Sequence, residues 1–157
     1  PPAVLHRISE QDSTDFDKCL RHIEAPLVLG YGFLGARLDH QLAAINVLVR
    51  RPDRRCVLVG PEDVVCLCPP DLTLDLGPGE RVSLFPMAEA GGLSEGLRWP
   101  LEGLHFRPGG AVGTSNEAVG PVRLTFATPS MLLILSVAHL NALVSGLERA
   151  PRWPARA

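Results

Sequence analysis

Acidic side chains gather in one short stretch near the N-terminus, the run EQDSTDFDKCL at residues 10–20. Asp12, Asp15 and Asp17 crowd together just where an apolar helical pattern begins. Capping and the helix dipole explain one carboxylate at the start of a helix. Two more carboxylates repel it, so such a cluster usually has a cation partner, either a metal ion or an arginine or lysine. The run therefore predicts a metal or phosphate site, with capping as the alternative, and Lys18 either neutralises the cluster or meets a phosphate.

A second stretch with chemical potential is GYGFLGARLDH, residues 30–40. A strand-like run leads into glycines and then into a helix whose first turn carries Arg37, Asp39 and His40. In parallel α/β sheets, ligands bind beyond the carboxyl ends of the strands, where helix N-termini present N–H groups. Glycine lets the backbone approach a phosphate, and arginine can hold one with two hydrogen bonds. The stretch is neither a Walker loop nor a dinucleotide fingerprint, so a plain strand–helix turn with a solvated Arg–Asp pair is the alternative.

Other candidate residues carry weaker signals when taken singly. Trp99 in GLRWPL, residues 96–101, is more often a core residue than a ligand platform, and GTSNEA, residues 113–118, is more often a hairpin turn than a binding loop. Cys66 and Cys68 fall on one face of an expected strand with no second ligand pair, which indicates buried thiols rather than zinc.

The elements that must position these residues change in character near residue 62. The first part alternates helix (from Thr14 as N-cap to before Pro26), strand (26–32), helix (37–51) and strand (55–60). This order predicts a parallel, Rossmann-like α/β sheet, with the strand at 26–32 covered on both faces. The expected buried stripes are Phe16, Cys19, Leu20 and Ile23 in the first helix and Leu38, Leu42, Ile45 and Val49 in the second.

Beyond residue 62, short β-like runs are separated by Pro, Gly and Asp turns. The pattern predicts an all-β sandwich of antiparallel strands over residues 63–136. Residues 131–147 are too short and too polar for a membrane span, which needs roughly 20 apolar residues. A buried strand at about 130–136 followed by a short amphipathic helix explains them better, and residues 137–157 form the expected C-terminal helix and tail.

Composition limits the classes of function. The 157 residues are 46% hydrophobic and 20% charged, with a net charge of −2, which is typical of a soluble globular protein without a nucleic-acid-binding face. Four cysteines without a signal peptide indicate reduced thiols in a cytoplasmic protein. The chain opens with Pro1-Pro2 and no initiator Met, which indicates a processed or partial chain.

Taken together and in order, these segments resemble the thiamine pyrophosphokinase family, whose members make thiamine diphosphate from thiamine and ATP. The family's QDxTDFxK run is similar to residues 11–18, and its GGRxDH turn is similar to residues 35–40. Its GL(K/R)W/Y-P-L and TSNE segments are similar to residues 96–101 and 114–117.

The resemblance implies an ATP-dependent diphosphokinase with an α/β catalytic domain, whose C-terminal part is residues 1–62, and a thiamine-binding β-sandwich. It also implies a homodimer whose active site lies between one subunit's α/β domain and the other's sandwich. The implied site residues fall into three groups. Those of the transfer centre are Asp15, as ligand of Mg²⁺, with Arg37 and Asp39; those around the nucleotide are Gln11, Asp12, Thr14, Lys18, Gly35 and His40; those around thiamine are Trp99, Ser115 and Asn116.

The chain also departs from the family pattern. The upstream acidic segments DGGAN and GDFDS are absent, Ala36 replaces a glycine, and residues 137–157 extend past the usual end. The expectation is therefore an enzyme chain that lacks the N-terminal part of its catalytic domain. A binding protein of the same architecture, which holds a ligand without turning it over, is the alternative.

Overall fold

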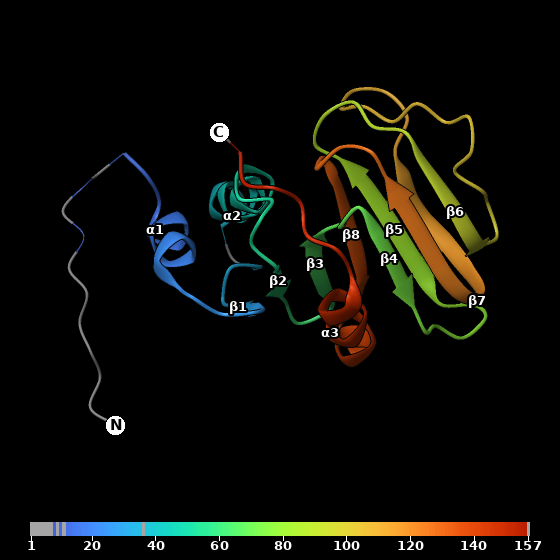
Figure 1. The fold of residues 1–157 in the computed structure, drawn as a ribbon, viewed down its shortest axis with the longest axis horizontal. Coiled ribbons are helices and arrows are strands. Elements are labelled where there is room, and N and C mark those ends of the chain that lie inside the picture. The colour runs from blue at the N-terminus through green and yellow to red at the C-terminus, as the bar shows by residue number, and fades with distance from the viewer. Residues whose placement is uncertain (1–7, 9, 11, 36, 157) are drawn as a thin grey trace.

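The computed structural model describes residues 8, 10, 12–35 and 37–156. Its elements alternate between helix and strand at first and are mostly strands afterwards (Figure 1). In chain order they are α1 (Asp15–His22), β1 (Val28–Tyr31), α2 (Leu38–Arg50), β2 (Cys56–Val59), β3 (Asp63–Leu67), β4 (Asp71–Leu74), β5 (Arg81–Pro86), β6 (Gly92–Leu97), β7 (Gly113–Phe126), β8 (Met131–Ser136), η1 (Val137–His139) and α3 (Leu140–Arg149).

The strands form one mixed sheet in the order β1-β2-β3-β8-β5-β7-β4, with β6 also paired to β7. β1 and β2 are parallel, as the helix–strand–helix–strand order predicts, and the other pairs are antiparallel. β2 pairs with β3, so hydrogen bonding continues across residue 62. The predicted boundary at residue 62, between an α/β part and a β-sandwich, stays a prediction.

Two apolar clusters lie on opposite faces of the sheet near β2. All four residues of β2 are buried, and they alternate between the clusters. Cys56 and Leu58 pack with α1 and α2, whereas Val57 and Val59 pack with the antiparallel strands. Figure 1 accordingly shows α1 and α2 toward one end of the molecule and β4–β8 toward the other.

The buried face of α1 differs from the expected stripe. Phe16 and Leu20 are buried as predicted, but Cys19 and Ile23 are exposed, so that part of the prediction was wrong. Asp17 is fully buried in their place. The reason is an ion pair between Asp17 and the end of α2, which turns the helix so that a carboxylate faces inward.

The stripe predicted for α2 was also displaced. Leu38 and Leu42 are exposed, whereas Val49 is buried and Ile45 packs half-buried against the core, as predicted. The other buried residues are Ala44, Val47 and Leu48. This helix has apolar residues on more than one side, so its periodicity leaves the buried face open. The small side chain of Ala44 allows the face around Val47 and Leu48 to approach the sheet.

The prediction that the strand at 26–32 is covered on both faces was wrong. Leu29 is 40% exposed and Tyr31 63% exposed. Among the described residues, β1 is an edge strand of the sheet and pairs only with β2. Its outward residues therefore lack a covering layer in the part of the chain that the structure describes.

The C-terminal region follows the predicted strand and helix. β8 ends at Ser136, and α3 buries Leu143 and Leu147 against the antiparallel strands. No helix within residues 12–35 and 37–156 is long and apolar enough to cross a membrane. After α3, Trp153 donates its indole N–H to the carbonyl of Cys68 at 2.9 Å and packs against both apolar clusters.

Candidate active site

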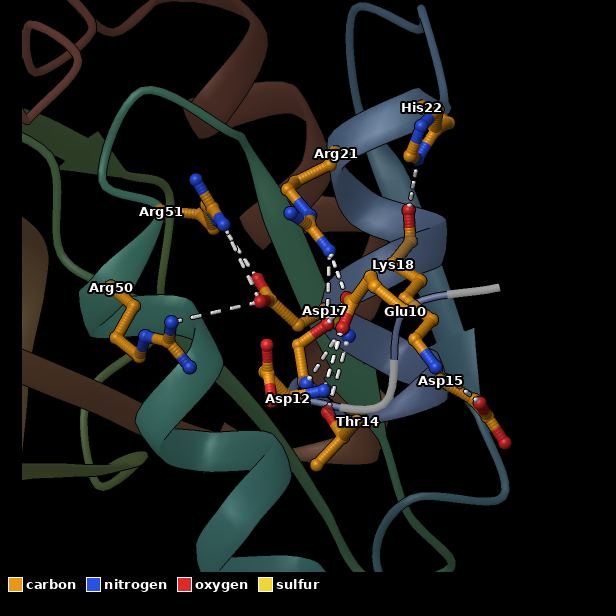
Figure 2. A network of polar contacts seen from close by, with 11 residues as sticks. Glu10, Asp12, Thr14, Asp15, Asp17, Lys18, Arg21, His22, Arg50 and Arg51 are labelled. Carbon is orange, nitrogen blue, oxygen red and sulfur yellow. Dashed lines mark hydrogen bonds and ion pairs between the residues drawn. The ribbon is translucent and has the colours of Figure 1, made fainter. Parts of the chain in front are cut away.

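The acidic run divides at the start of α1 into outward and inward carboxylates. Thr14 is the N-cap, and its hydroxyl accepts a hydrogen bond from the backbone N–H of Asp17 at 3.3 Å, as predicted. The side chain of Asp15 is fully exposed and points away from that of Asp17 (Figure 2). The ammonium of Lys18, a residue that is only 8% exposed, lies 3.7 Å from the Asp15 carboxylate.

Asp17 turns inward and is held by arginines from the end of α2. One carboxylate oxygen lies 2.8 Å from Nε of Arg51, the other lies 3.3 Å from its terminal nitrogen, and Arg50 approaches to 3.8 Å. The hydrogen bond from Arg51 lowers the pKa of Asp17 below its ordinary value. For this aspartate the cation partner is therefore an arginine. Sequence reasoning missed the pair because its members stand 34 positions apart.

The residues before α1 form a local network around Glu10. The backbone N–H of Asp12 donates to the Glu10 carboxylate at 2.7 Å, and Arg21 contacts the same carboxylate at 2.6 Å. A hydrogen bond from Ser13 is the largest of several contacts that lower the pKa of Glu10 to about 2. The Asp12 side chain is exposed, and Gln11 lies outside the described residues.

The second motif provides a glycine-bearing turn and the start of α2. Gly35 has φ +130°, a left-handed conformation that side chains beyond glycine rarely adopt. Arg37 is the N-cap residue of α2 and makes no side-chain capping bond. Its guanidinium instead donates twice to Asp39, at 3.2 Å and 2.6 Å, which lowers the pKa of Asp39. Both side chains are exposed, so this is the solvated Arg–Asp pair that the sequence analysis raised as an alternative.

The two motifs meet in one pocket of about 630 Å³ between α1 and the N-terminal half of α2. The lining includes six of the residues implied by the resemblance: Thr14, Asp15, Lys18, Gly35, Arg37 and His40. Asp12 and Asp39 do not line it. We name this cavity the α1–α2 pocket.

Packing between aromatic rings fixes one wall of the α1–α2 pocket. The rings of Phe16 in α1 and Phe33 in the loop after β1 have centroids 4.3 Å apart and are tilted by 42°. Both residues also line the pocket. The contact ties the acidic helix to the glycine-bearing turn, and Phe33 was not among the residues singled out in the sequence.

The donor set for a metal ion is small. Within the described residues, no group of three or more His, Cys, Asp or Glu side chains converges to form a metal site. Mg²⁺, however, commonly binds through one or two carboxylates together with substrate phosphates and water. The exposed carboxylate of Asp15 on the pocket wall fits that limited role, and it does not amount to an all-protein cage.

Trp99 lies just past the end of β6 and is 53% exposed, so it is not the core residue that the sequence analysis favoured for this tryptophan taken singly. The guanidinium of Arg98 stands 5.1 Å from the centroid of the indole ring. Asn116 is 6% exposed and clamps the backbone of Trp99. Its amide nitrogen donates to the Trp99 carbonyl at 2.7 Å, and its amide oxygen accepts from the Trp99 N–H at 3.2 Å.

Ser115 stands beside this clamp in an unusual backbone conformation. Its φ is +61°, and its backbone N–H donates to the hydroxyl of Ser83 at 3.0 Å. Trp99 and Asn116, but not Ser115, line a pocket of about 160 Å³. We name the exposed ring and this hollow the Trp99 platform. The segment 113–118 is the beginning of β7 rather than a hairpin turn.

Comparison with known proteins finds two family models that match the chain. Residues 2–59 match the family model described as thiamin pyrophosphokinase, catalytic domain, and residues 71–133 match thiamin pyrophosphokinase, vitamin B1 binding domain. Thiamine pyrophosphokinase 2 of Arabidopsis thaliana is 32% identical over 129 residues, which are 72% of this chain and 48% of that protein. Thiamine pyrophosphokinase 1 of the same plant is 32% identical over 146 residues, 83% of this chain and 54% of that protein.

Solved structures share the fold. The thiamine pyrophosphokinase of Bacillus subtilis superposes with a TM-score of 0.70 at 22% identity over 81% of this chain and 64% of that one. The enzyme of Geobacillus thermodenitrificans gives 0.67 at 23% identity over 86% and 66%. The chain spans about half the length of the curated relatives it matches. With both family models in chain order over most of its length, the chain belongs to the thiamine pyrophosphokinase family.

Proposed function

We propose that the protein acts as an ATP-dependent thiamine diphosphokinase. In this reaction the hydroxyl oxygen of thiamine attacks the β-phosphorus of ATP and loses its proton. The bond from that phosphorus to the α–β bridging oxygen breaks, AMP leaves, and thiamine diphosphate is formed. The observation that carries the proposal is the convergence of two separate motifs on the α1–α2 pocket.

The pocket's chemistry suits the transfer of a charged group. Diphosphoryl transfer needs alignment and charge neutralisation more than covalent chemistry from the protein. Lys18 and Arg37 bring two cations to the wall of one cavity. The start of α2 adds the positive end of a helix dipole on the same side. We assign the triphosphate of ATP to this pocket.

Asp15 is the residue that would hold Mg²⁺, which supplies charge neutralisation on the phosphates when it is bound. Its exposure leaves the carboxylate oxygens accessible from the pocket. Lys18 lies close enough to orient that carboxylate without enclosing it.

Asp39 has a positioning role in this proposal. It holds the Arg37 guanidinium through Nε and one terminal nitrogen, which leaves the other terminal nitrogen for a phosphate oxygen. An arginine held in this way loses less conformational freedom on binding than a mobile one.

Thiamine is assigned to the Trp99 platform. An exposed aromatic face suits a flat cationic heterocycle, and the Asn116 clamp fixes the backbone that carries the ring. We further propose a homodimer in which the platform of one subunit faces the α1–α2 pocket of the other. The finer description of a Rossmann-like unit joined to a β-sandwich belongs to the same proposal.

A cytoplasmic location is also part of the proposal. All four cysteines are unpaired, and three of them are buried. Burial raises the pKa of Cys56 and of Cys66 to about 12, so these thiols stay protonated. Unpaired, protonated thiols suit a reducing compartment.

The direct test is to incubate the full-length gene product with ATP, Mg²⁺ and thiamine and to analyse the products by mass spectrometry. Equal amounts of AMP and thiamine diphosphate are expected. Binding of both ligands without either product would contradict the proposal and favour the non-catalytic binding protein.

A further inference from the structure

A second charged cavity lies where the C-terminal end of α2 meets α1 and the last described residues. It has a volume of about 500 Å³ and is lined by Arg21, Arg50, Arg51, Asp53, Arg54, Ala155 and Arg156. We name it the arginine pocket. Five of the chain's fourteen arginines thus share one cavity in a protein whose net charge is −2. Figure 2 labels Arg21 of α1, Arg50 at the end of α2 and Arg51, the residue that caps α2.

The described carboxylates do not balance these cations. Glu10 contacts Arg21 at 2.6 Å, Asp17 contacts Arg51 at 2.8 Å and Arg50 at 3.8 Å, and Asp53 contacts Arg54 at 3.4 Å. Five guanidinium groups against three carboxylates leave a surplus of two positive charges. Like charges held around one cavity repel each other unless an anion joins them.

Contacts that stabilise the fold account for only some of the five arginines in the pocket. Arg51 fixes Asp17, and Arg54 donates to the carbonyls of Arg21 and Ile23 at the end of α1. Arg50, by contrast, makes only the long contact with Asp17 among the described residues, and its side chain is half exposed. Arg21 has a buried Nε with no hydrogen-bond partner among the described residues. Arg50 therefore has guanidinium donors that reach the cavity without a hydrogen-bond partner among the described residues.

We propose that the arginine pocket binds a small phosphate-bearing anion with two or more negative charges. A dianion offsets the surplus of two, and guanidinium groups match the oxygen geometry of phosphate with paired hydrogen bonds. The volume lies within the range of small-molecule sites. The pocket is separate from the α1–α2 pocket: its α2 residues stand at the C-terminal end of a helix of thirteen residues, whereas Arg37 and His40 stand at the start.

The test uses inorganic diphosphate as the probe, measured by isothermal titration calorimetry in EDTA at constant ionic strength. The double variant Arg50→Gln, Arg156→Gln removes two pocket cations that make no hydrogen bond to α1 among the described residues, and the hydrogen-bonded pair of Arg51 with Asp17 stays in place. Its diphosphate affinity should fall at least tenfold, with an unchanged melting temperature. The matched control Arg37→Gln removes one cation from the α1–α2 pocket and should leave this binding event in place. Glycerol phosphate serves as a second probe. It tests whether the pocket accepts a phosphate ester as well as a free inorganic anion, because the ester carries an organic group that also needs space in the cavity.

Three results would overturn the proposal. The first is wild-type affinity in the double variant, and the second is loss of all diphosphate binding in Arg37→Gln, which would place the anion in the α1–α2 pocket. The third is displacement of diphosphate by a duplex oligonucleotide that binds more tightly, which would make the occupant a polynucleotide. Partial recovery of affinity in Arg50→Lys, Arg156→Lys would support the proposal, since lysine restores the charge without the fork.

Discussion

In the α1–α2 pocket, Asp15 and His40 are exposed. Among the described residues, the charged groups of Lys18 and Arg37 pair only with nearby carboxylates. At the Trp99 platform, the side-chain amide of Asn116 forms hydrogen bonds with the backbone of Trp99. The backbone N–H of Ser115 donates to the hydroxyl of Ser83. The α1–α2 pocket therefore presents charged side chains to a ligand. The Trp99 platform instead presents an exposed aromatic ring whose backbone is fixed by hydrogen bonds from Asn116. Charge suits phosphates, and a supported ring suits a flat heterocycle.

Asp15→Asn should have the largest effect on activity. Transfer should fall at least about 100-fold, because the carboxylate that would hold Mg²⁺ on the phosphates is lost. The free energy of unfolding should change by less than about 1 kcal/mol, since the side chain is fully exposed and Thr14 remains the cap. Steady-state kinetics at saturating Mg²⁺ with chemical denaturation checks both. Near-normal turnover would make Asp15 a structural residue.

Asp17→Asn should reverse that pattern and mainly affect stability. The buried carboxylate is replaced by a neutral amide beside Arg51, and breaking a buried ion pair costs about 3 kcal/mol. Denaturant titration measures the loss, with Asp15→Asn as the matched exposed control. Equal stability of the two variants would show that the inward pair contributes nothing.

The same pair predicts an acid dependence. Because the folded state lowers the pKa of Asp17 below 3.8, its contribution is present above that pH and is lost as the pH falls through the folded value. Asp17→Asn should therefore lose less stability than the wild type between pH 4 and the acid limit of folding. Parallel acid-unfolding curves would contradict this.

Trp99→Ala should weaken thiamine binding and leave ATP binding almost unchanged. Stacking on an aromatic face contributes roughly 0.5–2 kcal/mol, which corresponds to a rise in the thiamine dissociation constant of about two- to thirtyfold. Separate titrations of the two ligands measure it. A loss of folding stability of about 3 kcal/mol or more would instead mark Trp99 as a core residue.

Arg37→Lys should have the smallest effect, a modest loss of ATP affinity with thiamine affinity preserved. Lysine keeps the charge but loses the fork that both Asp39 and a phosphate can use. Direct binding assays with each ligand separate the outcomes. Loss for thiamine alone, or equal loss for both, would remove Arg37 from the phosphate site.

Local features of the site could be predicted from the sequence, because they depend on neighbours in the chain. Thr14 caps α1 through a residue three positions away, and the glycine turn leads directly into α2. The orientation of Asp17 could not, because it depends on Arg51, 34 positions away. β6 was also missed. Its Gly96 has φ +74° at a register shift opposite β7, and a Cβ there would lie 2.0 Å from the Pro121 carbonyl oxygen, so the position requires glycine, a residue that is depleted in strands.

Mixing subunits tests the central claim, that the α1–α2 pocket of one subunit works with the Trp99 platform of its partner. Asp15→Asn and Trp99→Ala proteins are combined at a thiamine concentration far below the wild-type dissociation constant, the residual turnover of each variant alone is measured and subtracted, and subunit exchange is demonstrated separately. Each mixed dimer rebuilds one intact site, so random exchange should restore about a quarter of the wild-type activity. No recovery despite demonstrated exchange would contradict the shared site.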